Sequence, residues 1–340
     1  MKPWMVQKEQ SGHTCVECIR YSYLFMAGLS VLIVWLHLAT LLLAALFAYL
    51  ALTRLEIKLR WGRTFAVILF VLALGGIAYV IAYFTNQTIH ALPEIGEKAI
   101  PAIINWAKEH GIELPFTDYD SLKDLAFDTV KTEVQFLASF AKFARGASTQ
   151  ALFLAAGCVV AVSIYLNPRF ELTSSHQNKS LNLYSACCQE IAGRFRTLYG
   201  SFVTVMGAQI IISAINTVLT GIFVLAFQMP YAVVIIGVTF FCGLLPVVGN
   251  LISNTMVVAI GFTVSPRLAL GALMFLIVIH KLEYFLNSKI VGWRIHNPLW
   301  LTLLGLIVGE RLLGIPGMIL APVVLNYIRL EMSRVSVSSA

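Results

Sequence analysis

The feature that most constrains this chain is a series of apolar runs long enough to cross a bilayer. Such runs cover residues 64–84, 149–167, 200–229 and 266–287. About 20 apolar residues are needed to span a hydrocarbon core of about 30 Å. Inside lipid only helices and closed barrels satisfy their own backbone groups, and these runs are continuously apolar instead of alternating. The sequence therefore predicts an all-α polytopic membrane protein.

The distribution of charge along the chain predicts how it is oriented. Of the 340 residues, 59% are hydrophobic and only 12% are charged, with a net charge of +7. Residues 86–148 hold nine acids and six bases, a net of −3, so the remainder holds eighteen bases and eight acids, a net of +10. The positive-inside rule produces this asymmetry. We therefore expect residues 86–148 outside a bacterial cytoplasmic membrane, and the basic balance does not indicate a nucleic-acid partner.

The membrane runs divide the chain into six expected segments with about eight membrane segments among them. The run 21–52 is short for two spans and long for one. We expect two short tilted helices that bend near His37 to Thr40, and a single span with its tail outside is the alternative. The six segments are a cytoplasmic tail (1–20), N-terminal membrane helices (21–85), an extracytoplasmic helical segment (86–148), a span with a cytoplasmic amphipathic helix (149–199), a transport core (200–330) and a second tail (331–340).

Two apolar runs, 231–262 and 298–328, are interrupted by helix breakers. A straight helix over the second run would be about 46 Å long at about 1.5 Å per residue, too long for one span, while two full spans would need about 40 residues. Re-entrant pairs of half-helices fit both runs, and two such interrupted segments are typical of a transporter's substrate site. The expected hinge residues are Gly243, Pro246, Gly249, Gly309, Gly314, Pro316 and Gly317.

Glu310 and Arg311 are adjacent charges inside the second broken run. Neighbours on a helix do not face each other, so each needs another partner, such as Lys281 or Glu283. An ionisable residue within a membrane segment is a functional hypothesis by default. The alternative is a hairpin tip that reaches the surface, where both side chains are solvated.

Polar side chains at helical spacing follow two of the membrane runs. Their oxygens suit a substrate hydroxyl or a sodium ion, and we expect them to line the pathway. The alternative is that they hydrogen-bond between helices, as such residues commonly do in membranes. The candidates are Asn250, Ser253 and Asn254 in one run, and Gln209, Ser213, Asn216 and Thr220 in the other.

Three stretches together resemble the autoinducer-2 exporter family of bacterial permeases: "FQMPYAVVIIGVTFFCGLLPVVGN", "KIVG" and "NPLWLTLLGLIVGERLLGIPGMILAPVV". The resemblance covers roughly residues 20 to 335 and is strongest from about 195 onward. A proline common in the first hairpin of the family is replaced here by "HLAT", and Ser288 stands where a proline often precedes the Lys-Ile-x-Gly step. The matching positions are Pro246, Gly249, Lys289, Gly292, Pro298, Gly314 and Gly317.

The resemblance implies secondary transport, which is export of a quorum-sensing signal in some members and sodium(lithium)/proton antiport in others. It also implies a homo-oligomer, with a pentamer as one form, and no cofactor beyond a coupling proton or sodium ion. Enzyme signatures such as H-E-x-x-H, G-x-S-x-G and the P-loop are absent from the sequence. His13, Cys15 and Cys18 lack the fourth ligand of a closed zinc site, so we favour a plain thiol pair and no metal. A membrane scaffold that binds a partner through residues 86–148 is the alternative from another class.

Overall fold

A computed structural model describes residues 16–56, 62–112, 133–167, 183–245, 248–286 and 298–334, and in these ranges the regular elements are all helices, joined by turns. The predicted all-α class is therefore confirmed. Helices long and apolar enough to cross a membrane, by length and composition, are found five times in the described part. They cover Glu17–Trp35, Gly62–Thr88, Ser148–Leu166, Leu183–Ala226 and Ile315–Met332.

The first apolar run folds into two helices, α1 (Val16–Trp35) and α2 (Ala39–Leu55). The chain breaks between them at His37, whose φ of 52° lies in the left-handed region. The predicted bend near this residue is confirmed. α2 packs along α5 (Glu133–Leu166), where a Cβ on Gly157 would lie 2.5 Å from the Leu41 carbonyl oxygen. Small residues allow this close backbone approach, as in many membrane helix pairs.

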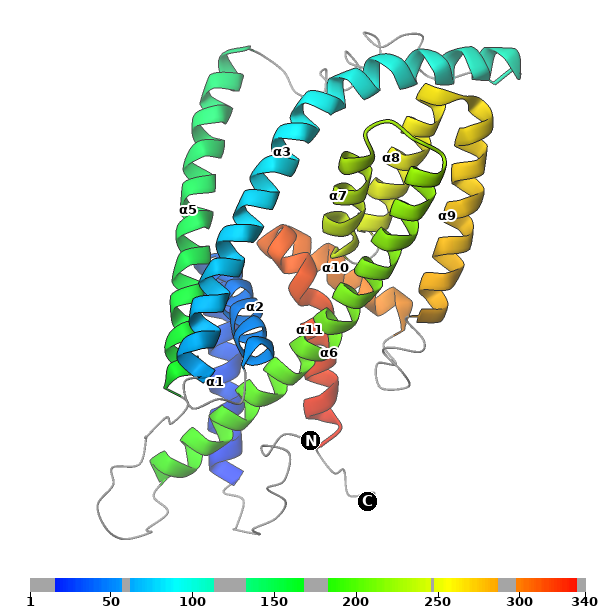
Figure 1. Cartoon of the computed structure of the whole chain (residues 1–340). Coiled ribbons are helices and arrows are strands. Elements are labelled where there is room, and N and C mark those ends of the chain that lie inside the picture. Colours follow the sequence, from blue (N-terminus) through cyan, green and yellow to red (C-terminus); the bar gives the residue numbers. More distant parts are fainter. Residues whose placement is uncertain are drawn as a thin grey trace, which may run out of the picture.

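α3 (Gly62–Glu109) is a single helix of 48 residues. Its first part is the apolar span 62–88, and residues 89–109 continue beyond it as an extension that we call the α3 arm. Figure 1 shows this arm bending across one end of the molecule, above α8 and α9. We call this the distal end. Residues 86–109 and 133–148 are helical as predicted, whereas residues 113–132 lie outside the described ranges.

α6 (Leu183–Ala226) is also a single helix, of 44 residues. The sequence led us to expect two elements here, an amphipathic helix before residue 199 and a separate span from 200. No proline interrupts this stretch, and isolated glycines cost a helix only about 1 kcal/mol each, so the two elements are continuous. Figure 1 shows α6 crossing from the opposite end, which we call the proximal end, to the distal end.

Both interrupted runs are broken helices, as predicted. α7 (Ala232–Gly243) and α8 (Val248–Val264) form the first pair, and α9 (Pro266–Leu286) follows. α10 (Leu299–Leu313) and α11 (Ile315–Met332) form the second pair, joined at Gly314, whose φ is 65°. Whether either pair is re-entrant depends on the position of the bilayer and stays a prediction.

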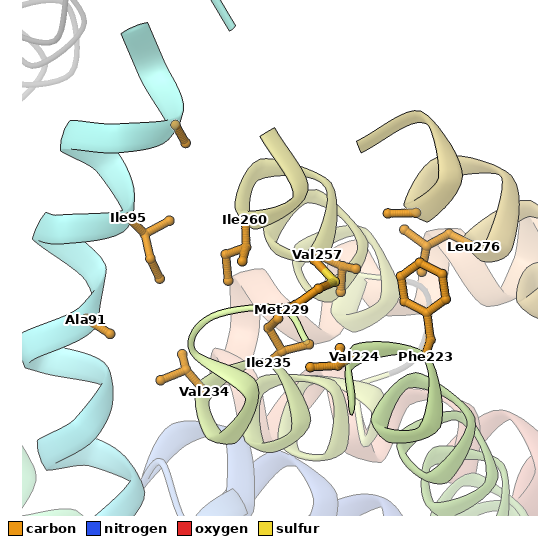
Figure 2. Close-up of a cluster of buried hydrophobic side chains, with 12 residues drawn as sticks. Ala91, Ile95, Phe223, Val224, Met229, Val234, Ile235, Val257, Ile260 and Leu276 are labelled. Carbon is orange, nitrogen blue, oxygen red and sulfur yellow. The ribbon is translucent and has the colours of Figure 1, made fainter. Parts of the chain in front are cut away.

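In the described ranges the helices bury three apolar clusters. One lies among α2, α3 and α5, a second among α2, α6 and α11, and a third among α6 to α9. The last of these, which we call the distal cluster, also includes the α3 arm (Figure 2). Its members are Ala91, Ile95, Ala99, Phe223, Val224, Met229, Val234, Ile235, Val257, Ile260, Ala272 and Leu276.

Candidate functional site

A small polar pocket lies among α6, α7, α8 and α9, directly next to the distal cluster. Within the described part of the chain it gathers side-chain oxygens and nitrogens from four helices. Its free volume of about 10 Å³ is close to the least that one water molecule needs. The lining residues are Asn216 and Thr220 of α6, Thr239 of α7, Asn250, Ser253 and Asn254 of α8, and Leu276, Ile279, His280 and Glu283 of α9.

Helical spacing explains how each helix brings its polar residues to the pocket. Residues three or four apart lie on the same face of a helix. On α8 this places Asn250, Ser253 and Asn254 together, and on α6 it aligns Asn216 with Thr220. The structure therefore brings four of the predicted pathway residues, with Thr220, into one site.

Among the described residues, Glu283 supplies the only carboxylate that lines the pocket, and its side chain is 13% exposed. Both of its oxygens accept a hydrogen bond from the Asn250 amide nitrogen, at 2.7 Å and 2.6 Å. The His280 ring nitrogen Nδ1 lies 3.9 Å from Glu283 Oε2, and this ring is largely exposed at the rim. A carboxylate among apolar helices, with an amide donor on one side and a titratable ring on the other, can exchange a proton or hold a cation.

Asn216 supplies a second oxygen whose hydrogen-bonding capacity is unused. This residue is 4% exposed, and its Oδ1 atom has no hydrogen-bond partner among the described residues. Buried polar atoms are nearly always paired, so an unpaired one indicates a water, an ion or a ligand group. Because Asn216 lines the same pocket as Glu283, the two oxygens offer a binding site built from side-chain oxygens.

Gln209 and Ser213, from the same polar face of α6, bind the end of α7 instead of lining the pocket. Gln209 Nε2 donates to the Gly243 carbonyl oxygen at 2.7 Å, and Ser213 Oγ donates to the Phe240 carbonyl oxygen at 2.7 Å. Helix C-termini leave carbonyl groups unpaired, and these side chains satisfy two of them. On the predicted polar face of α6, Asn216 and Thr220 thus line the pocket, whereas Gln209 and Ser213 bind the end of α7.

The hinge between α7 and α8 depends on glycines that allow close packing. A Cβ on Gly249 would overlap the Cys242 carbonyl oxygen, and one on Gly243 would lie 2.6 Å from Ser213 Oγ. Gly249 is therefore required by contact with backbone, whereas a larger residue at Gly243 would displace the Ser213 hydroxyl. Pro246, the remaining hinge residue predicted here, lies outside the described residues.

In the second hairpin, glycines also allow the two helices to pack closely. A Cβ on Gly309 would lie 2.5 Å from the Gly317 carbonyl oxygen, and one on Gly317 would overlap the Gly309 carbonyl oxygen. Gly314 forms the turn, and Pro316 stands in the first turn of α11, where a missing amide hydrogen has no cost. Of the five predicted hinge glycines, Gly314 forms a turn, Gly249, Gly309 and Gly317 lie against backbone carbonyl oxygens, and Gly243 lies against the Ser213 side chain.

Glu310 and Arg311 lie at the tip of the second hairpin, away from the polar pocket. Their side chains are 54% and 84% exposed, and Arg311 Nε lies 3.8 Å from Glu310 Oε2. Glu283, one of the partners that we expected for them, accepts hydrogen bonds from Asn250 instead. A pathway role for this charged pair stays a prediction.

Sequence reasoning missed the pocket roles of Glu283, His280 and Thr239. The available signal was the pair His280 and Glu283 three residues apart at the end of an apolar run, which places both on one helix face. Of the expected thiol pair, Cys15 lies outside the described residues together with His13, and Cys18 is buried with its sulfur 4.0 Å from the Leu183 carbonyl oxygen.

A buried ion-pair cluster at the proximal end was also missed. Arg194 of α6 donates to the Glu331 carboxylate of α11 and lies 4.2 Å from the centre of the Tyr23 ring of α1. The Tyr23 hydroxyl donates to Glu331 Oε2 at 3.3 Å, and Arg334 donates to Glu331 Oε1 at 3.3 Å and to Thr197 Oγ1 at 2.9 Å. These residues lie far apart in the sequence, so no local pattern indicated their contact.

Comparison with known proteins places this helical architecture and its pocket in a family. Over 122 residues the chain is 32% identical to a protein of Bacillus subtilis (strain 168) that is named "Putative transport protein YdbI". The match spans 35% of this chain and 35% of that relative, so it covers about a third of either protein. No solved structure matches the chain. Residues 21–330 match the model of the AI-2E family transporters, and the chain therefore belongs to this family of multi-pass membrane transporters.

Proposed function

We propose that the chain is a secondary transporter of a small polar solute and that the polar pocket is its binding site. The observation that carries this proposal is that the Glu283 carboxylate and the Asn216 Oδ1 atom, which has no hydrogen-bond partner among the described residues, line the same pocket. Ionisable side chains within membrane segments are rare and mark functional sites by default, because a charge is costly in lipid. Membership of the AI-2E family supports a quorum-sensing signal such as autoinducer-2 as the solute.

The pocket is too small for such a solute in the observed conformation. Its free volume of about 10 Å³ holds one water molecule or a small ion. A polar solute with several hydroxyl groups would therefore enter only after α8 and α9 move apart from α6 and α7. This requirement is expected of an alternating-access transporter, whose site opens to one side at a time.

Sodium(lithium)/proton antiport is the second candidate function, and the size and chemistry of the pocket favour it. The unused oxygen of Asn216 and the Glu283 carboxylate are hard ligands, and hydroxyls of Thr220 and Ser253 line the same space. A sodium or lithium ion could occupy this space without opening the site, and a proton on Glu283 would compete with it. The same exchange would supply ion coupling for solute export.

The position of the α3 arm argues against the alternative in which residues 86–148 form a scaffold that binds a partner. Ala91, Ile95 and Ala99 of this arm are buried against α7, α8 and α9, so the arm packs on the body of the transporter.

A homo-oligomer, for which a pentamer is the form expected, and a bacterial cytoplasmic membrane remain part of the proposal. Native mass spectrometry of the protein in detergent would measure the number of subunits.

The test is flux in proteoliposomes, with two matched variants. Glu283→Gln and Glu310→Gln make the same chemical change, one in the pocket and one at the exposed hairpin tip. We would impose a pH gradient, add sodium or lithium and follow an internal pH dye, and then measure efflux of labelled autoinducer-2. The proposal expects Glu283→Gln to abolish coupled flux and Glu310→Gln to retain it. The reverse result would move the site to the tip of the second hairpin.

A further inference from the structure

The distal cluster lies about one helical turn beyond the polar pocket on every helix that lines it. α6 and α8 run toward the distal end, so higher residue numbers on them are more distal, and α7 and α9 run the opposite way (Figure 1). On α6, Thr220 of the pocket is followed by Val224, and on α8 Ser253 is followed by Val257. Leu276 of α9 belongs to both the pocket and the cluster. The cluster therefore closes the pocket on its distal side.

The closure is tight and apolar. Val224 and Ile260 are 0% exposed, and Ile235 and Val257 are 1% exposed. Figure 2 shows these side chains converging from α6, α7 and α8, with Phe223 beside Leu276. A polar solute or a hydrated ion leaving the pocket distally would have to pass through a closely packed apolar layer, in which it would lose its hydrogen bonds to water.

The pocket is less closed at its α9 rim. The His280 side chain is 73% exposed at the rim, and Glu283 retains 13% exposure. The site therefore has an accessible side, marked by His280, and a sealed side, marked by the distal cluster. A transporter with one open and one sealed side must break the seal once in each cycle.

The α3 arm completes the seal from outside the four-helix group. Figure 2 shows Ala91 and Ile95 directed at the cluster, opposite Val234 and Ile260. Farther along the arm, the Trp106 ring lies 5.8 Å from that of Phe262 at the end of α8. The apolar face of the arm is thus buried on the hairpin along several turns.

The arm is also well placed to move. It continues directly from the span 62–88 of α3, in which only 11% of the most apolar window is buried inside the protein. The span is anchored by Ala66 and Phe70 in the cluster with α2 and α5 and touches α7 through Phe84, whose ring lies 5.5 Å from that of Phe241. A tilt of α3 about this anchor would carry the arm with it. We propose that the distal cluster is the gate on the distal side of the pocket and that the α3 arm is a strap that must leave α7 and α8 for this gate to open.

This inference rests on the proposed transport function, and the experiment separates the two. In a background with all six native cysteines replaced, Ala91→Cys and Val234→Cys would be joined by a short bifunctional thiosulfonate that dithiothreitol removes. The matched control is Ala48→Cys with Ala161→Cys, two buried alanines in the cluster of α2, α3 and α5. Flux before linking measures the transport function, and flux after linking measures the strap.

We expect linking of the arm to lower flux at least tenfold, with recovery on reduction, and linking of the control pair to leave flux unchanged. Full linking of the arm with unchanged flux would overturn the strap. A second measurement does not depend on flux: Asn254→Cys in the pocket is labelled by a membrane-impermeant thiol reagent added to the distal side of oriented vesicles. The gate predicts at least tenfold slower labelling once the arm is linked, and an unchanged rate would overturn it even in a protein that shows no flux.

Discussion

Replacing Glu331 by methionine should destabilise the fold by about 3–5 kcal/mol, because the Arg194 charge would stay buried without its main partner. The two side chains are only 4% and 9% exposed. The cost should lie at the lower end of this range, since Glu190 Oε2 remains 3.4 Å from the Arg194 guanidinium and the Tyr23 ring remains at 4.2 Å. At about 1.4 kcal/mol for each factor of ten, 3 kcal/mol lowers the folding equilibrium constant more than a hundredfold.

The double variant Arg194→Met with Glu331→Met makes the prediction specific. Replacing both members of a buried pair by apolar side chains of similar volume is often neutral or stabilising. Arg334, which loses its contact to Glu331, is 57% exposed and can be solvated. The double variant should therefore be more stable than Glu331→Met alone.

Reversible unfolding by sodium dodecyl sulfate in mixed micelles, followed by circular dichroism, would compare Arg194→Met, Glu331→Met and the double variant with the unchanged protein. Non-additivity is the quantity of interest, since contacting residues show interaction energies that distant ones do not. A double variant whose loss equals the sum of the two single losses would refute the reasoning, because the two charges would then not compensate each other.

Two further predictions concern packing and pH. Gly249→Ala should lower the free energy of unfolding by about 1–3 kcal/mol or more, because its Cβ would overlap the Cys242 carbonyl oxygen. Gly271 has open space around it, so the control Gly271→Ala should be neutral or slightly stabilising. The same unfolding assay compares the two variants, and equal losses of stability would contradict the close contact at Gly249. On the α3 arm, the hydrogen bond from Lys98 holds the pKa of Glu94 below its usual 4.5, and Glu94 holds the pKa of Lys98 above its usual 10.5. The stability that the ionised Glu94 contributes is therefore present above about pH 4.5 and lost on further acidification, and the stability that the charged Lys98 contributes is present below about pH 10.5. Hydrogen exchange of residues 91–99, corrected for intrinsic rates, should be constant from about pH 5 to 9 and faster below about pH 4. A change near neutral pH would contradict this assignment.

The breaks in the fold were predictable because they depend on local chemistry. Gly314 has a positive φ that other residues rarely adopt, and it ends α10 where the sequence placed a break. Glycine and proline act on the backbone within a few residues, so their effect is visible in one sequence. The bend near His37 is a harder case, since it was indicated only by the length of the apolar run and by the basic residues on both of its flanks.

The assignment of polar faces was predictable only in part. Helical spacing correctly grouped Gln209, Ser213 and Asn216 on one face of α6. It could not show that the first two bind the end of α7 while Asn216 lines the pocket. Periodicity tells which residues share a face, but the helix that covers each part of that face is decided by tertiary packing.

Contacts between distant segments were beyond the reach of sequence patterns. Arg194 and Glu331 are separated by 137 residues, and Asn250 and Glu283 by 33. The charge inside the second broken run drew attention to Glu310, whereas the carboxylate that lines the pocket is that of Glu283. The length of α6 was underestimated for a related reason, because a change in composition at residue 200 resembled a boundary although no breaker was present.

Carbodiimide modification of carboxyl groups tests the central claim, that the polar pocket is the binding site, most directly. The reagent labels carboxyl groups in apolar surroundings, and mass spectrometry of peptides would locate and time the label on the intact protein in vesicles. The account predicts that Glu283 is labelled and that autoinducer-2, sodium or lithium slows this labelling, while Glu310 reacts at the same rate with or without them. Labelling of Glu283 that none of these ligands changes, together with protection of Glu310, would contradict it.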